Sequence, residues 1–144
     1  MPRNPRNRLP PEGVYHVTAR GAGRLPIFVA DVDRLDFLSL LAAVTGATGW
    51  TCHAFCLMTT HYHLVVGAVL EQLSKGMHQL NGTYALRFNR RHERRGHLFD
   101  SRFSAWVVRD DAHFEATCRY VLDNPVRAGL STPDEPWPWA AHVT

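Results

Sequence analysis

The chain has 144 residues, 45% of them hydrophobic, and a net charge of +3, which suits one compact domain. No apolar run approaches the roughly 20 residues of a membrane span, and no apolar stretch follows the Arg-containing N-terminus as in a secretory signal. Three cysteines without a signal peptide indicate reduced thiols, their spacing does not favour a zinc cluster, and we expect a cytoplasmic protein.

Arginine is concentrated in two parts of the chain. Five arginines fall within the first 24 residues and seven between Arg87 and Arg109, whereas Lys75 is the one lysine among 16 basic residues. Arginine is suited to bidentate contacts with phosphate. An Arg-rich composition with a solvated charged face is the alternative, and composition alone does not choose between the two.

Hydrophobic periodicity predicts the elements in chain order. Residues 1–13, rich in Pro and Arg, are expected to form a flexible basic arm, followed by a single domain over residues 14–144. The predicted elements are a strand over 14–20, a helix that Asp31 or Asp33 caps and Gly46 or Gly49 ends, strands over 50–58 and 61–69, a long helix over 73–88, a strand over 102–109, and a helix from Asp110 or Asp111 to about Asp123, where Asn124-Pro125 should stop it.

This order predicts an α+β fold. Strand, helix, strand, strand, helix, strand and helix correspond to a ferredoxin-like split βαβ arrangement with a central antiparallel sheet and added C-terminal helices. We expect helices to cover one main face of the sheet. The other face would be free to carry chemistry.

Two histidines lie one residue apart in the apolar run "FCLMTTHYHLVV". In a strand over 61–69, the larger apolar residues at 62, 64 and 66 would face the core, so His61 and His63 would lie side by side on the opposite face. Neutral imidazole is a common metal ligand. Two histidines hydrogen-bonded on a sheet surface are the alternative, and a metal site would need a third protein ligand.

A tyrosine lies off the apolar stripe of the last predicted helix. Phe114, Cys118, Val121 and Leu122 form the stripe, and Tyr120 falls about 140° from its centre. Asn124, four residues on, shares the face of Tyr120, as does His113. An interface anchor is one interpretation of Tyr120. If this helix covers the open sheet face, Tyr120 could instead be a nucleophile and Asn124 a third metal ligand.

The end of the long helix and the following loop predict a nucleic-acid surface. Arginines there occur together with an aromatic residue, a combination that suits binding of single-stranded nucleic acid. The alternative is that these cations are present because a helix C-terminus favours positive charge. The candidate DNA-binding residues are Arg20, Arg87, Arg90, Arg91, Arg94, Arg95, His97 and Arg102.

Four segments together resemble single-tyrosine HUH transposases, particularly REP-associated tyrosine transposases. They are "YHVTARG", "FCLMTTHYHLVV", "RFNRRHERRGHLFDSRF" and "YVLDNPVRAGL", in that order, within residues 14 to 139. The resemblance implies a transposase that cuts and rejoins single-stranded, hairpin-forming DNA. It implies His61 and His63 as ligands of Mg²⁺ or Mn²⁺, Asn124 as the third ligand, and Tyr120 as the nucleophile that forms a 5′-phosphotyrosine.

Two positions depart from the family pattern. Thr60 stands where the family often has Asn, and Asp100-Ser101 where it often has Gln-Gly, so the DNA sequence preference is not carried over. A non-catalytic nucleic-acid-binding domain, a metal-dependent hydrolase and a domesticated HUH nickase stay open as alternatives. So does the choice between a monomer and a homodimer.

Overall fold

The computed structural model describes residues 9–143. It contains a five-stranded antiparallel sheet in the order β4-β1-β3-β2-β5. The elements are β1 (Glu12–Arg20), the 3₁₀ turn η2 (Ala22–Arg24), α1 (Asp31–Thr48), β2 (Thr51–Leu57), β3 (His61–Val69), α2 (Leu70–Arg91), β4 (Ser104–Val108), α3 (Asp111–Leu122), α4 (Asn124–Arg127) and β5 (Ala140–His142). The predicted α+β fold is confirmed. No helix among the described residues is long and apolar enough to cross a bilayer.

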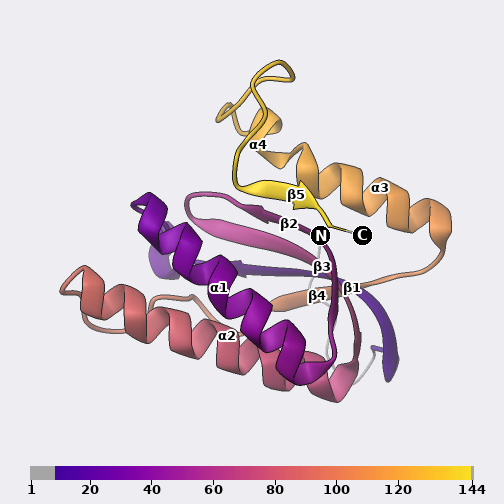
Figure 1. The fold of residues 1–144 in the computed structure, drawn as a ribbon, viewed down its shortest axis with the longest axis horizontal. Coiled ribbons are helices and arrows are strands. Elements are labelled where there is room, and N and C mark those ends of the chain that lie inside the picture. The colour runs from indigo at the N-terminus through magenta and orange to yellow at the C-terminus, as the bar shows by residue number, and fades with distance from the viewer. Residues whose placement is uncertain (1–8, 144) are drawn as a thin grey trace.

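The larger core lies between the sheet and the helix pair α1 and α2. Tyr62, Leu64 and Val66 of β3 are fully buried in it, as the strand alternation predicts. Figure 1 shows α1 and α2 together on one side of the sheet, with α3 lying apart from them. A smaller core on the other sheet face includes Cys118 and Val121 of α3. The second face is therefore partly covered, rather than fully open.

Several element boundaries differ from the sequence prediction. β1 begins at Glu12, two residues early, and Leu9 is buried, while residues 1–8 of the predicted arm lie outside the described part of the chain. Ala30, and not an aspartate, occupies the N-cap of α1. Asp33 instead reaches back to accept hydrogen bonds from the backbone N–H groups of Val29 and of the N-cap residue Ala30, which ties the start of the helix to the preceding loop.

The helical path does not stop at Pro125. α3 ends at Leu122, but α4 follows at once, with Asp123 in a right-handed helical conformation between them. The backbone N–H of Arg127 donates to Asp123 O at 3.1 Å, and that of Ala128 to Asn124 O at 3.0 Å. Proline is tolerated here because it lies in the first turn of α4, where an N–H lacks an intrahelical partner anyway. Thus residues 120 to 127 follow one nearly continuous helical path.

Close packing of α1 against α2 leaves no room beside Gly76. A Cβ atom there would collide with the Trp50 ring and lie 3.0 Å from Val44 Cγ1. We expect Gly76→Ala to lower the free energy of unfolding by about 1–3 kcal/mol, because the core must shift to admit the methyl group. Urea titration measures this.

The control is Gly82→Ala on the exposed side of the same helix, where nothing lies within 4 Å of the new Cβ. It should raise the free energy of unfolding by about 0.5–1 kcal/mol through helix propensity. Equal changes in the two variants would contradict the packing argument.

Candidate active site

Strand register gathers polar side chains on the sheet face that α3 covers. Directly opposite residues of an antiparallel pair point to the same side of the sheet. Arg20 of β1 lies opposite His61, and His16 of the same strand lies opposite Val65. Trp106 of β4 in turn lies opposite His16. Three strands therefore contribute to one polar surface.

The apolar stripe of α3 holds that helix on the same face. Cys118 and Val121 pack in a small core with Ala54, Cys56 and Val65. The predicted stripe therefore faces the sheet. With the stripe docked on the sheet, Tyr120, which lies off the stripe, has its ring in edge contact with His16 and His63.

A buried hydrogen-bond chain joins two strands to the start of α4. His63 Nδ1 lies 2.9 Å from His16 Nε2, and His63 Nε2 lies 3.0 Å from Asn124 Nδ2. An amide nitrogen is a donor, so His63 Nε2 accepts the bond from Asn124. In neutral imidazole the proton is then on Nδ1, which donates to His16 Nε2. The chain thus fixes one tautomer of His63, with its Nε2 lone pair directed at Asn124.

All three histidines of the surface are held neutral. Burial lowers the pKa of His16 to about 4, with a smaller effect from His113. Burial and Arg20 lower the pKa of His61 to about 4. The pKa of His63 falls to about 2 through burial, the two neighbouring histidines, Arg20 and Arg127. A neutral imidazole keeps one unprotonated ring nitrogen, which is the form that binds a metal ion, so these side chains could act as ligands at neutral pH.

Tyr120 reaches the histidines within the same chain. The centroid of its ring lies 6.0 Å from that of His16 and 6.2 Å from that of His63, with edge contacts to both. The side chain is 51% exposed, whereas the other tyrosines of the chain, Tyr15, Tyr62 and Tyr84, are fully buried. The structure therefore brings Tyr120 and Asn124 to the histidine pair. Their chemical roles stay predictions.

The donor set fits a divalent metal ion. The rings of His61 and His63 have centroids 5.1 Å apart and lie edge to face. Within residues 9–143 no group of three or more His, Cys, Asp or Glu side chains is arranged to hold a metal ion. A third protein ligand must then be of another type, and the amide of Asn124 contacts His63 directly. Imidazole nitrogen and amide oxygen are both ligands of divalent ions in proteins.

Comparisons with known proteins show the family of the chain. The family model described as IS200-like transposase matches residues 12–124. The chain belongs to the IS200-like transposase family. This membership makes it a transposase by family, a class of enzymes that process DNA.

Two solved structures share the fold of this transposase. A REP-associated tyrosine transposase bound to a REP hairpin matches with a TM-score of 0.74 and 15% identity, over 97% of this chain and 82% of that one. A transposase structure from Deinococcus radiodurans R1 matches with a TM-score of 0.55 and 18% identity, over 86% of this chain and 97% of that one. No curated protein sequence matches the chain.

His16 is a site residue that sequence reasoning missed. The strand prediction covered it, and alternation gave its face relative to its neighbours in β1. The sequence did not show which side chains of β1 lie on the same sheet face as His61 and His63, because strand register is set by the tertiary fold. The observed pairing of Thr18 with His63 brings His16 beside the predicted pair.

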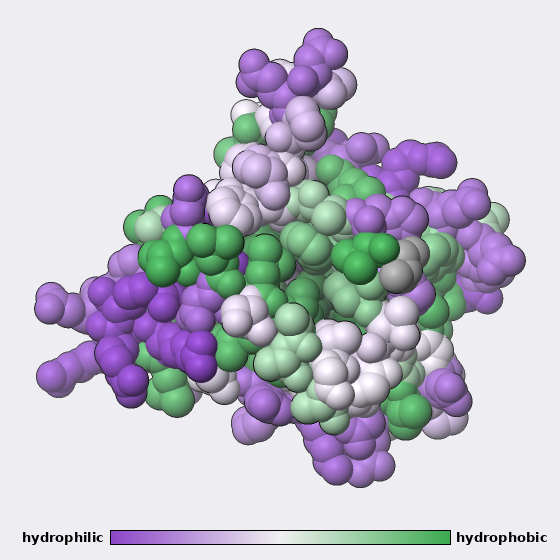
Figure 2. Space-filling view, viewed as in Figure 1, coloured by the Kyte–Doolittle hydropathy of each residue, from purple (hydrophilic) through white to green (hydrophobic). Residues whose placement is uncertain are grey.

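The predicted DNA-binding arginines of the transposase divide into two groups. Arg87 and Arg91 form ion pairs with acids of α1, Asp36 and the buried Asp33. Burial alone would raise the pKa of Asp33, but hydrogen bonds from Ala30, His92, Val29 and Arg91 outweigh it and lower that pKa. These two arginines therefore hold α2 against α1. Figure 2 shows hydrophilic residues gathered at the left of the view, over the start of α1 and the end of α2.

The remaining candidates lie in other surroundings. The guanidinium of Arg94 donates to the Asn89 side chain and to the carbonyls of Gly96 and His97, so it shapes the loop after α2. Arg90 and Arg95 are exposed. Arg20 acts electrostatically on both His61 and His63.

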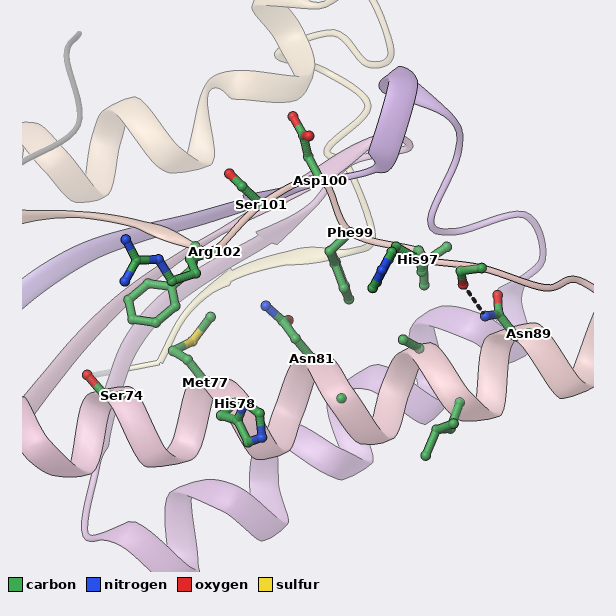
Figure 3. A pocket seen from close by; sticks show the side chains of 16 residues that line it. Ser74, Met77, His78, Asn81, Asn89, His97, Phe99, Asp100, Ser101 and Arg102 are labelled. Atoms are coloured by element: carbon green, nitrogen blue, oxygen red, sulfur yellow. Dashed lines mark hydrogen bonds between the residues drawn. The ribbon is translucent and has the colours of Figure 1, made fainter.

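A groove of about 790 Å³ lies between α2 and the loop over 96–103. His97, Phe99 and Arg102 line it from the loop, and Asn81 lines it from α2. Figure 3 shows these four side chains, with Asn89 bonded to the loop farther along α2. Two candidate DNA-binding residues, His97 and Arg102, therefore share one surface with an aromatic ring.

The two buried histidines predict loss of stability in acid. Their pKa values in the folded protein, about 4 for His16 and about 2 for His63, lie below the ordinary 6.5. Below pH 6.5 the unfolded chain therefore binds more protons, so the free energy of unfolding falls as the pH falls. Each histidine contributes a slope approaching about 1.4 kcal/mol per pH unit.

Urea titrations at intervals from pH 7 to 5 measure that slope. The double variant His16→Leu/His63→Leu should have a shallower slope than wild type. His142→Gln, which changes an exposed histidine, should leave the slope unchanged. If the double variant kept the full slope, other groups would be responsible for it.

Proposed function

We propose that this transposase cuts and rejoins single-stranded DNA by transesterification, through a 5′-phosphotyrosine at Tyr120. The observation that carries the proposal is the meeting of an exposed tyrosine with the chain His16, His63 and Asn124 on one sheet face. A covalent intermediate keeps the energy of the phosphodiester, so a second strand can be joined without ATP.

Tyr120 is the nucleophile in this proposal. Its phenolic oxygen attacks the phosphorus, the bond from phosphorus to the 3′-oxygen breaks, and the electron pair leaves on that oxygen. The phenolic proton passes to solvent, which the half-exposed ring admits, and the 3′-oxygen takes a proton from water. The reverse reaction with a new 3′-hydroxyl rejoins the strand.

His61, His63 and Asn124 would hold a divalent ion, Mg²⁺ or Mn²⁺. When bound, such an ion polarises the scissile phosphate and offsets the charge that develops on it. His63 would bind through Nε2, and the Asn124 amide would turn its oxygen toward the ion. His16 Nε2 accepts a hydrogen bond from the Nδ1–H group of His63. This bond keeps the proton off His63 Nε2 and holds the ring in place.

Single-stranded hairpin DNA is the proposed substrate. The REP-associated transposase of similar fold was solved with a REP hairpin, which supports this class of ligand. Arg20 beside the histidines, the exposed Arg90 and Arg95, and the groove residues His97 and Arg102 are proposed to contact it. Arginine with an aromatic ring suits backbone neutralisation together with base stacking.

Removal of one oxygen atom tests the nucleophile. We expect Tyr120→Phe to reduce formation of the covalent protein–DNA adduct by about 10³-fold or more, because no other tyrosine is exposed. The substrate is a pool of single-stranded hairpins, randomised beside the stem and labelled at the 3′ end. With Mn²⁺, the label should stay with wild-type protein in denaturing gels.

The same gels separate the alternatives. A binding domain would retain the DNA in chelator and give no adduct in any condition. A hydrolase would release cut DNA without adduct, and Tyr120→Phe would remain active. Adduct formation by Tyr120→Phe at the wild-type level would contradict the assignment.

The proposed site lies within one chain, which a mixing experiment tests. Tyr120 and His63 are neighbours in a single polypeptide, so a mixture of Tyr120→Phe with His63→Ala should form no more adduct than either variant alone. Restored adduct would mean that the nucleophile and the metal ligands act from different chains. Wild type diluted to the same active concentration gives the reference rate.

A further inference from the structure

Arg127 lies against the proposed nucleophile, although sequence reasoning gave it no role. Its guanidinium carbon lies 4.2 Å from the centroid of the Tyr120 ring, over the ring face. Its Nη2 donates to the Tyr120 carbonyl at 2.6 Å. A guanidinium on an aromatic face is an attractive contact, and here it holds the ring and the arginine in one fixed arrangement.

The nearly continuous helical path places three functional side chains in line. Tyr120, Asn124 and Arg127 are related by steps of four and three residues, which lie on one face of a helix. Tyr120 and Asn124 both contact His16 or His63. Arg127 adds a permanent positive charge to this face, at the side chain that would attack the phosphate.

A second guanidinium group belongs to the same surface. Arg20 of β1 lies opposite His61 in the sheet, and Arg127 of α4 lies over the Tyr120 ring. Two guanidinium groups, from β1 and from α4, therefore lie near the proposed site. Such a pair suits an anion with several oxygens, because guanidinium donors match phosphate geometry.

A purely structural role would explain part of this geometry. A cation near a helix C-terminus often bonds the last carbonyl groups, as Arg127 does with Tyr120 O. That role alone does not require the guanidinium to lie over the tyrosine ring. The ring contact aligns it with the one exposed tyrosine of the chain.

We propose that Arg127 is a catalytic residue of the strand-transfer site, where its guanidinium contacts a non-bridging oxygen of the scissile phosphate while it holds the Tyr120 ring. This inference rests on the proposed function. As the bond from Tyr120 Oη to phosphorus forms and the bond to the 3′-oxygen breaks, the non-bridging oxygens gain charge. A donor already in place stabilises that charge without rearrangement.

The test compares Arg127→Gln with Arg119→Gln. Arg119 lies on α3 beside Phe114 and Cys118, so its removal changes the net charge equally but leaves the Tyr120 ring contact intact. At saturating 3′-labelled hairpin pool and Mn²⁺, we expect Arg127→Gln to slow single-turnover adduct formation about 100-fold. Arg119→Gln should stay within about 3-fold of wild type, and both variants should bind hairpin with similar affinity by fluorescence anisotropy.

Rescue distinguishes chemistry from helix capping. Guanidinium ion at non-denaturing concentration should raise the rate of adduct formation by Arg127→Ala at least about 10-fold, because it can occupy the place of the missing side chain. It should not accelerate wild type or Tyr120→Phe. Circular dichroism of each variant checks that α3 remains folded.

Four outcomes would decide the inference. Wild-type rates in Arg127→Gln would overturn it and leave the proposed function intact, as long as Tyr120→Phe forms no adduct. Equal slowing by Arg119→Gln, or failure of guanidinium to rescue a folded Arg127→Ala, would also overturn it. Absence of adduct in wild type would overturn the proposed function and this inference together.

Discussion

The alternation of β3 is the constraint on which the site depends. Nine residues of this strand must divide between two faces, and the fully buried Tyr62, Leu64 and Val66 commit one face to the core with α1 and α2. A shift of one residue would move every side chain to the other face. His61 and His63 are therefore held on the α3 side by packing that occurs on the opposite side of the sheet.

Burial of His63 is tolerated because both of its ring nitrogens are paired. An unpaired polar group in an apolar setting costs about 1–3 kcal/mol. Both ring nitrogens of His63 meet partners, one from β1 and one from the start of α4. Completing this chain requires both the sheet register and the docked helix. The polar site and the small apolar core around Cys118 and Val121 therefore stabilise each other.

The sequence was sufficient to predict those features of the fold and the site that follow from local periodicity. Strand alternation predicted the histidine face, and helical spacing predicted that Tyr120 and Asn124 share a side of the last helix. His16 was missed because local alternation does not reveal which strands pair or in what register. The ion pairs of Arg87 and Arg91 were missed because their acids lie on α1, about 50 residues earlier in the chain. Contacts between residues far apart in the chain produce no periodic pattern in the sequence.

Arg127 was missed for a different physical reason. Pro125 was interpreted as the end of the helix, although a proline in a first turn removes no bond that the helix needs. Because the path continues, Tyr120, Asn124 and Arg127 are aligned along it in steps of four and three residues. Their alignment with the histidines then depends on how α3 seats against β2 and β3. A small shift of that helix would displace nucleophile, amide and guanidinium together, so the apolar stripe of α3 sets the geometry of the whole site.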